Sequence, residues 1–237
     1  MKLTQYGSNS ILIQLKEVID PEVNETVSWL NSKLEMMPEI VYTIPAYNSV
    51  TAVFNPGKIS FDVLKNRIKS WESKEKKNTI SSKEQRSFRI PVCYEEKFAP
   101  DMEEVCSYTS LTSEQIISLH TSTPFKVYMI GFIPGFPYLG KLPDQLRCKR
   151  KENPRKQVPQ GAVGLAGSQT GIYPAQAPGG WQLIGNSPVP PLNLAEQNPF
   201  LFRMGDTVRF YPISASEHST IATGFSKGQI TEKEFYE

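Results

Sequence analysis

The N-terminal part of the chain alternates between the apolar spacing of strands and that of helices. Apolar residues recur at every second position over residues 11–15, which predicts a half-buried strand. Over residues 23–37 they recur three or four positions apart, which predicts one apolar stripe along a helix. Asp20 and Pro21 suit its N-cap and first position, because proline lacks only an N–H group that would have no partner there. Pro38 is expected to end this helix.

The alternation continues with two more strands and a second helix. Residues 40–44 and 50–54 predict strands, and residues 60–71 predict a helix that begins with a capping serine. The order strand, helix, strand, strand, helix is typical of a ferredoxin-like α/β layer, in which two helices cover an antiparallel sheet. We expect residues 88–92 to supply the fourth strand of this sheet.

A polar segment follows the second helix. Residues 71–87 carry many charges and almost no apolar side chains, which favours a linker or an exposed loop. We therefore predict a small α/β domain over residues 1–87 and a second domain over residues 88–237. The alternative is a long solvated hairpin inside a single domain.

The second half of the chain has a different pattern of residues, with many glycines and prolines. Thr112 and Gln115 have the spacing of a capping box, so we expect a short helix that begins there and ends at His120. Residues 126–132 predict a strand. Ten of the 15 glycines then lie between residues 131 and 185, with short apolar runs between them. Many short strands joined by glycine and proline turns are typical of a β-barrel or a sandwich.

Composition and charge limit the classes of function. The chain has 237 residues, with 26 lysines and arginines against 24 acidic residues and a net charge of +2, which argues against a nucleic-acid binder. Its three cysteines form no CxxC pair and its two histidines lie far apart, so we expect reduced thiols and no zinc site. It shows neither an apolar leader nor a run of about 18 apolar residues, so we expect a cytoplasmic protein without a membrane span.

Common nucleotide motifs are absent from the sequence. Residues 161–167, GAVGLAG, are rich in glycine but lack the lysine and the following helix of a phosphate-binding loop. We expect a strand and turn of the barrel there rather than a phosphate site.

The segment GFIPGFPYLG, residues 131–140, holds aromatic side chains between proline and glycine turns. Prolines fix the backbone and glycines permit conformations that other residues resist, so this loop is expected to be rigid. It could present Phe132, Phe136 and Tyr138 to a ligand or a partner protein, or it could be a packed loop.

A basic segment follows this loop. Between residues 147 and 156 six cations face one acidic residue, Glu152. Arg155 lies close to a Val-Pro pair that favours extended backbone, and a guanidinium can bind a carboxylate or a phosphate with two parallel hydrogen bonds. The alternative is a solvated basic face.

The third segment, residues 168–188, combines neutral polar side chains with a PGGW turn. Backbone amides beside adjacent glycines can bind an anion, although a structural turn with a core tryptophan is the alternative. The candidate residues are Gln169, Thr170, Tyr173, Gly179, Gly180 and Trp181.

Two histidines complete the candidate chemistry. His120 lies at the end of its predicted helix, where the helix dipole favours the protonated form, so it could act as a general acid or base near neutral pH. A packed core histidine is the alternative. His218 lies in a polar stretch and is expected at the surface.

Several of these segments keep a fixed order over residues 88–212. They run from His120 through GFIPGFPYLG, VPQGAVGLAG, QTGIYP and APGGWQLIGNSP to MGDTVRF. In this order they resemble the Kip-inhibitor / allophanate hydrolase subunit 1 family, also known as carboxyltransferase subdomain C/D. The resemblance implies an α+β architecture in which an N-terminal ferredoxin-like α/β domain is followed by a C-terminal cyclophilin-like β-barrel.

The resemblance also implies an enzyme subunit that is inactive alone. Together with 5-oxoprolinase subunits C and A, it would convert 5-oxo-L-proline to L-glutamate with ATP and Mg at the level of the complex, and without a protein-bound metal. Other branches of the family imply an inhibitor of a sensor histidine kinase's autophosphorylation, or the carboxyltransferase module of a urea carboxylase or allophanate-type system. No nucleic-acid or membrane partner is implied.

In the 5-oxoprolinase reaction we expect Arg155 to pair with an anionic group and His120 to move a proton. Backbone amides at the paired glycines would face developing negative charge, and aromatic side chains would form an apolar wall. The substrate- or nucleotide-binding set is Phe136, Tyr138, Gln169, Tyr173, Gly179, Gly180 and Trp181.

Overall fold

The computed structural model describes residues 1–74, 86–194 and 198–237. Contacts divide the chain into two compact units, Met1–Glu84 and Gln85–Glu237. We propose that they are the two domains predicted over residues 1–87 and 88–237. The linker predicted over residues 71–87 lies largely outside the described residues. No helix among the residues described is long and apolar enough to cross a bilayer.

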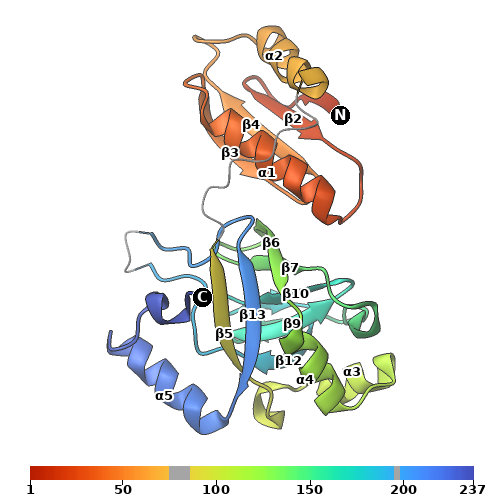
Figure 1. Cartoon of the computed structure of the whole chain (residues 1–237), viewed down its shortest axis with the longest axis vertical. Coiled ribbons are helices and arrows are strands. Elements are labelled where there is room, and N and C mark those ends of the chain that lie inside the picture. Colours follow the sequence, from red (N-terminus) through yellow and green to blue (C-terminus); the bar gives the residue numbers. More distant parts are fainter. Residues whose placement is uncertain (75–85, 195–197) are drawn as a thin grey trace. The chain divides into compact units, whose positions relative to one another are not determined.

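The first unit is a four-stranded antiparallel sheet with two helices (Figure 1). Its strands follow the order β1-β2-β4-β3, and the helices α1 and α2 bury apolar residues against them. The elements are β1 (Lys2–Gln5), β2 (Ser10–Gln14), α1 (Pro21–Glu35), β3 (Ile40–Pro45), β4 (Ser49–Phe54) and α2 (Phe61–Lys74).

The predicted helices and central strands of this unit are confirmed. Oδ1 of Asp20 accepts hydrogen bonds from the backbone N–H groups of Glu22 at 2.9 Å and Val23 at 3.3 Å, so it caps α1 as expected. Pro21 is the first residue of the helix, which ends before Pro38.

The predicted fourth strand is wrong. β5 (Ser87–Cys93) belongs to the barrel of the second unit, and β1 occupies the free edge beside β2. β1 was missed because it is an edge strand with mostly exposed residues, so its sequence carries no apolar alternation. Gly7, with a φ of +71°, lies in the turn that joins the two strands.

The second unit is a closed barrel of seven strands, in the order β10-β7-β6-β13-β5-β12-β9. The two longest, β5 and β13, run parallel, and β8 and β11 form a separate two-stranded sheet. These strands are β6 (Phe125–Ile130), β7 (Pro137–Gly140), β8 (Arg155–Val158), β9 (Ala162–Ala166), β10 (Gln169–Ile172), β11 (Ala177–Gly179), β12 (Gln182–Asn186) and β13 (Thr207–Ile213).

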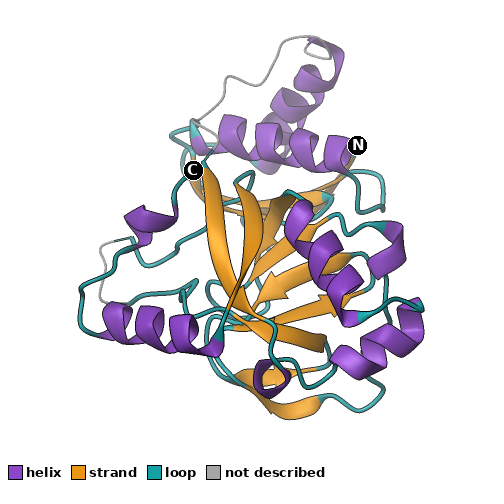
Figure 2. Cartoon of the chain, turned by 60° about the horizontal axis from the view of Figure 1, so that its bottom comes forward, coloured by secondary structure: helices purple, strands orange, loops and turns teal. Residues whose placement is uncertain are grey.

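Helices lie on the outside of this barrel (Figure 2). The capping box that opens α4 is confirmed: the side chain of Thr112 accepts from Gln115 N at 3.3 Å, and Thr112 N donates to Gln115 Oε1 at 2.9 Å. The helical elements are α3 (Met102–Thr109), α4 (Ser113–Ser122), α5 (Ala215–Ser226), and the short 3₁₀ segments η1 (Glu96–Phe98), η2 (Asp144–Leu146) and η3 (Glu232–Phe235).

Two strands predicted in the second unit can be compared with the structure. The glycine-rich residues 161–167 do form a barrel strand, β9, whose residues are all buried. The strand predicted over residues 126–132 ends earlier, at Ile130, because Gly131 N donates to Phe136 O at 3.1 Å and closes a turn. Phe132 lies in that turn with a φ of +68°.

Candidate functional site

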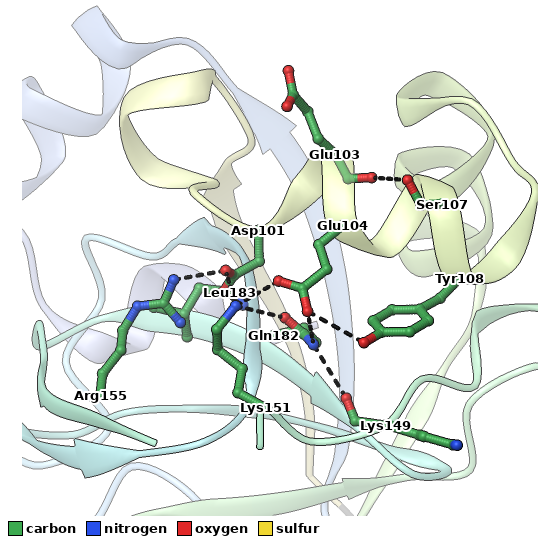
Figure 3. A network of polar contacts seen from close by, with 10 residues as sticks. All are labelled: Asp101, Glu103, Glu104, Ser107, Tyr108, Lys149, Lys151, Arg155, Gln182 and Leu183. Atoms are coloured by element: carbon green, nitrogen blue, oxygen red, sulfur yellow. Dashed lines mark hydrogen bonds and ion pairs between the residues drawn. The ribbon is translucent and has the colours of Figure 1, made fainter. Parts of the chain in front are cut away.

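A charged network joins α3 to strand β12 (Figure 3). Asp101, which precedes α3, donates its backbone N–H to Leu183 O at 3.0 Å. In return, Leu183 N donates to Asp101 Oδ2 at 2.7 Å. This two-point attachment fixes the carboxylate against the barrel.

The other oxygen of the Asp101 carboxylate binds two cations. Oδ1 accepts from Lys151 Nζ at 2.9 Å and from Arg155 Nη2 at 2.6 Å. Burial alone would raise the pKa of Asp101, whose side chain is 3% exposed, but the hydrogen bonds from Arg155, Leu183 and Lys151 outweigh burial and lower it. The carboxylate is therefore charged over the physiological pH range.

Lys151 has an acceptor for each of its three ammonium hydrogens. Besides Asp101 it donates to Glu104 Oε2 at 2.5 Å and, at the limit of a hydrogen bond, to Gln182 Oε1 at 3.5 Å. The hydrogen bond to Glu104, followed by that to Asp101, raises the pKa of Lys151. Its charge is thus held inside the network.

The hydrogen bonding of Arg155 differs from that of Lys151. It begins β8, where its Cα lies opposite that of Gly179 in β11. In the part of the chain that the structure describes, its guanidinium makes one hydrogen bond, to Asp101, and Nη1 is buried with no partner. Arg155 is therefore a predicted site residue whose donors are not all used among the described residues.

The predicted aromatic residues form one cluster, which packs against apolar side chains of β9 and β12. The ring centroid of Phe136 lies 4.8 Å from Tyr138, 5.1 Å from Tyr173 and 5.2 Å from Trp181, all with edge-to-face geometry. Phe136, Tyr173 and Trp181 are buried, whereas Tyr138 is half-buried and Phe132, which also contacts Phe136, is exposed. The buried rings therefore form a small hydrophobic core within this chain.

The PGGW turn fits closely against this cluster. A Cβ atom on Gly179 would collide with the hydroxyl of Tyr173, whereas one on Gly180 would meet only ordinary contacts at 3.5 Å from Lys151 O and Pro154. Burial raises the pKa of Tyr173 to about 12, although its hydroxyl accepts a hydrogen bond from Trp181 N. Gly179 therefore connects Arg155 with the aromatic cluster.

His120 lies in a separate, fully buried position. Its Nδ1 is 2.7 Å from Tyr94 Oη and its Nε2 is 2.9 Å from Thr170 Oγ1, and its ring stacks on Phe210 at 4.5 Å. Burial lowers the pKa of His120 to about 3. The expectation that the helix end favours a protonated ring is wrong, because removal from water outweighs the dipole.

The remaining predicted residues lie apart from the charged network. Gln169 is buried in β10 beside Thr170, which binds His120. His218 is half-buried rather than simply at the surface, since its Nε2 lies 2.8 Å from Asn186 Oδ1 and its ring packs on Phe98 at 4.5 Å. The structure thus brings Arg155, Gly179 and the aromatic cluster together.

Sequence reasoning missed the acidic half of this site. Asp101 and Glu104 lie about 50 positions before the cations they bind. Gln182 is the first residue of β12 and is followed by apolar residues. The available signal was charge balance: a basic segment of +5 needs acidic partners if it is to be partly buried.

The fold defines the architecture of the chain. The described residues form a four-stranded α/β unit and a closed seven-stranded barrel, and this fold is shared with a solved urea amidolyase. Residues 1–202 match the family described as carboxyltransferase domain, subdomain C and D, and the chain belongs to this family.

Similar proteins carry more specific names. The chain is 37% identical over 207 residues to the 5-oxoprolinase B-subunit of Escherichia coli O157:H7, covering 87% of this chain and 93% of that protein. It is 36% identical over 227 residues to the 5-oxoprolinase B-subunit of Bacillus subtilis, covering 92% and 95%. Its fold matches the crystal structure of K. lactis urea amidolyase with a TM-score of 0.79 and 20% identity, over 97% of this chain and 16% of that one.

Proposed function

We propose that this chain is the B-subunit of an ATP-dependent 5-oxoprolinase, which converts 5-oxo-L-proline to L-glutamate together with subunits A and C. The observation that carries the proposal is the identity of 36–37% to proteins named as the 5-oxoprolinase B-subunit, across nearly the whole of each chain. Relatives that match end to end at this level usually share their reaction, whereas a shared fold alone would carry no such weight.

We assign the proposed substrate-binding roles to Arg155 and the residues around it. The guanidinium would bind the substrate carboxylate, since it is the cation with donors left over. The turn at Gly179 and Gly180 would place backbone amides near developing negative charge. Tyr138, the half-buried member of the aromatic cluster, would contact the apolar part of the substrate.

The proposed role of His120 changes with its environment. At neutral pH the ring is uncharged, because its pKa is about 3, and both ring nitrogens lie at hydrogen-bonding distance from buried hydroxyls. A proton transfer through His120 would have to pass by way of Tyr94 or Thr170. Its catalytic role stays a prediction.

Two candidate groups for a nucleotide phosphate are already engaged within this chain. The backbone of the glycine-rich strand β9 is paired with β10 and β12, and Lys151 is saturated by its own carboxylates. We therefore propose that ATP and Mg act at the level of the complex, with subunits A and C as partners in the cytoplasm.

Reconstitution tests the proposed function. Purified subunits A and C would be assayed for 5-oxoproline-dependent formation of glutamate and ADP, with and without this chain. The proposal predicts coupled formation of both products only when the chain is present. Full activity of subunits A and C alone would reject it.

A carboxyltransferase module is the second candidate, favoured by the fold shared with urea amidolyase. In that case the same reconstitution would give no glutamate, and a biotin carboxylase partner would be needed for activity. A sensor histidine kinase as partner stays a prediction, which a binding assay with the kinase would test.

A further inference from the structure

A cavity of about 280 Å³ opens at the surface of the barrel unit, and we call it the Phe200 cavity. Phe200 is 44% exposed at this cavity, whereas Phe202 is buried. None of the lining residues has a role in the proposed function. They come from the end of β6 and from the segment before β13, and they are Ile130, Asn198, Pro199, Phe200, Phe202 and Arg203.

The size and lining of the Phe200 cavity suit one large apolar side chain. A cavity of roughly 150 Å³ can hold a benzene ring, whereas pockets for small molecules and cofactors begin at about 300 Å³. Two phenylalanine rings, an isoleucine and a proline make up most of the lining. An aromatic or large aliphatic side chain therefore fits this cavity, and a nucleotide is too large for it.

The Phe200 cavity is continuous with the loop that presents Phe132. Ile130 lines the cavity and is the last residue of β6, directly before this loop. A Cβ atom on Gly135 in the loop would lie 3.0 Å from Leu192, whose backbone forms a β-bridge with Phe200. The loop and the cavity therefore belong to one surface.

Phe132 is held in an exposed position by its backbone. Its side chain is 58% exposed, and its φ of +68° is unusual for a bulky residue. Its ring contacts Phe136 edge-to-face at 5.9 Å. Exposed apolar surface of this kind marks interaction sites, and aromatic side chains are enriched in protein interfaces. A protein partner would cover both the cavity and Phe132, whereas a small molecule inside the cavity would leave Phe132 in water.

The charge at the cavity indicates the chemistry of that partner. Arg203 is the charged residue among those that line it. In the ranges that the structure describes, the Arg203 guanidinium forms no hydrogen bond or ion pair. The nearby carboxylate of Asp206 is engaged instead by Arg86 Nε at 3.1 Å, by Arg86 Nη2 at 2.5 Å and by Arg203 N at 2.6 Å. A carboxylate of the partner is therefore the complementary group.

We propose that the Phe200 cavity and Phe132 form a docking surface for a protein partner. The partner inserts one aromatic or large aliphatic side chain into the cavity and places a carboxylate against Arg203. This docking surface rests on the proposed function and deepens it, because a B-subunit has to associate with other subunits.

Substitutions of the two exposed phenylalanines test the apolar part of the surface. Calorimetry would measure binding of the full chain to purified subunits A and C, each alone and as a mixture. Phe200→Ser and Phe132→Asn should each weaken binding by about tenfold or more, because each removes an aromatic anchor. Asparagine tolerates a positive φ, so Phe132→Asn keeps the turn.

Val63→Ser is the matched control for these variants. Val63 is an exposed apolar residue of α2, in the other unit, and does not line the cavity. Its substitution should change the dissociation constant by less than about twofold, since single exposed apolar side chains outside an interface contribute little.

Substitution of Arg203 tests the charged part of the surface. Arg203→Gln should weaken binding by about tenfold and make the affinity less sensitive to salt, because a charge-assisted contact is lost. Arg209→Gln is the matched control, since it removes an exposed cation of β13 that does not line the cavity. A merely structural role of Arg203 would leave the salt dependence unchanged.

Three results would overturn the docking surface. They are unchanged affinity in Phe132→Asn and Arg203→Gln, absence of binding by the wild-type chain, and a dimer of the chain alone that dissociates in Phe200→Ser. Sedimentation of the chain alone detects the dimer, which would assign the surface to a second copy. Thermal unfolding shows whether Phe200→Ser is folded, and Phe132→Asn decides the apolar test if it is not.

The reconstitution assay separates this proposal from the proposed function. Glutamate formation with the wild-type chain, together with unchanged binding by the variants, would reject the docking surface alone. Weakened binding by the variants, together with a wild-type assembly that forms no glutamate, would reject the proposed function and leave the docking surface standing.

Discussion

Two arginine–aspartate pairs in the barrel unit differ in how completely the arginine is used. Arg86 donates to Asp206 through Nε at 3.1 Å and Nη2 at 2.5 Å, to Leu201 O at 3.1 Å and to Tyr236 Oη at 3.3 Å. Arg155 makes one hydrogen bond to Asp101 among the described residues and buries Nη1 without a partner there.

Arg86 is a structural arginine, whereas Arg155 is the arginine that we propose binds the substrate. Arg86 fastens the start of β5 to the loop before β13 and to the C-terminal residues, and each of its three nitrogens is engaged within the chain. Arg155 lies about as close to its aspartate, but its Nη1 has no hydrogen-bond partner among the described residues. Residue type, charge and burial are similar at the two sites, so the unused donors are what distinguishes Arg155 from Arg86.

The largest expected effect is on stability at Arg86. Arg86→Met would leave Asp206, which is 4% exposed, as a buried carboxylate without its cation, at a cost of about 3 kcal/mol. Arg155→Met should cost about 1 kcal/mol, because Asp101 keeps its hydrogen bonds from Lys151 and Leu183. Urea unfolding of both variants measures the difference, and equal losses would contradict the distinction between the pairs.

His120 is a buried neutral group, so the stability of the fold should depend on pH through it. Its pKa is about 3 in the folded chain and 6.5 in the unfolded chain, so between these values the unfolded state binds one more proton. Stability from His120 is complete above pH 6.5 and is lost as the pH falls, by about 2–3 kcal/mol down to pH 4.5. The unfolding free energy of wild type and His120→Gln, measured across this window, should fall more steeply in wild type, since burial also lowers the pKa of His218 and gives both proteins a smaller slope of the same sign. The same slope in both would contradict the burial of a neutral ring.

The paired glycines test how tightly Arg155 is joined to the aromatic cluster. Gly179→Ala would drive a methyl group into the Tyr173 hydroxyl, whose ring is buried and cannot move aside, at a cost of about 2 kcal/mol. Gly180→Ala is the matched control and should cost under about 1 kcal/mol, because its Cβ meets ordinary contacts. Thermal unfolding of both variants decides the point, and similar melting temperatures would break the proposed link.

Lys151 is expected to give the smallest effect. Lys151→Met removes a cation that is 21% exposed and bound to two carboxylates, and we expect a loss of about 1 kcal/mol. Binding of 5-oxo-L-proline should change less than in Arg155→Lys, because Lys151 has no donor to spare. Urea unfolding and a titration with 5-oxo-L-proline together measure this, and a larger loss of binding at Lys151 than at Arg155 would reverse the assignment.

Local patterns were sufficient where a contact is local in sequence. The Asp20 cap, the capping box at Thr112 and the apolar stripe of α1 each depend on residues within a few positions of one another. β1 escaped prediction because an exposed edge strand needs no apolar alternation, and β5 was misassigned because strand pairing is a long-range choice.

The site was predictable only in part. Arg155, Tyr173 and Gly179 were identified from turn chemistry and residue type, and they do lie together. Asp101 could not be found this way, because its partners lie about 50 residues further along the chain or beyond. The charge of His120 was also misjudged, since burial cannot be read from the position of a residue at a helix end.

The most direct test of the account compares the two arginines in one sample. In full-length protein labelled with ¹⁵N-arginine, the side-chain signals of Arg86 and Arg155 would be assigned with Arg86→Lys and Arg155→Lys and followed during titration with 5-oxo-L-proline. We predict that the Arg155 signals shift and saturate while those of Arg86 stay in place. Unchanged Arg155 signals, or equal shifts at both arginines, would contradict it.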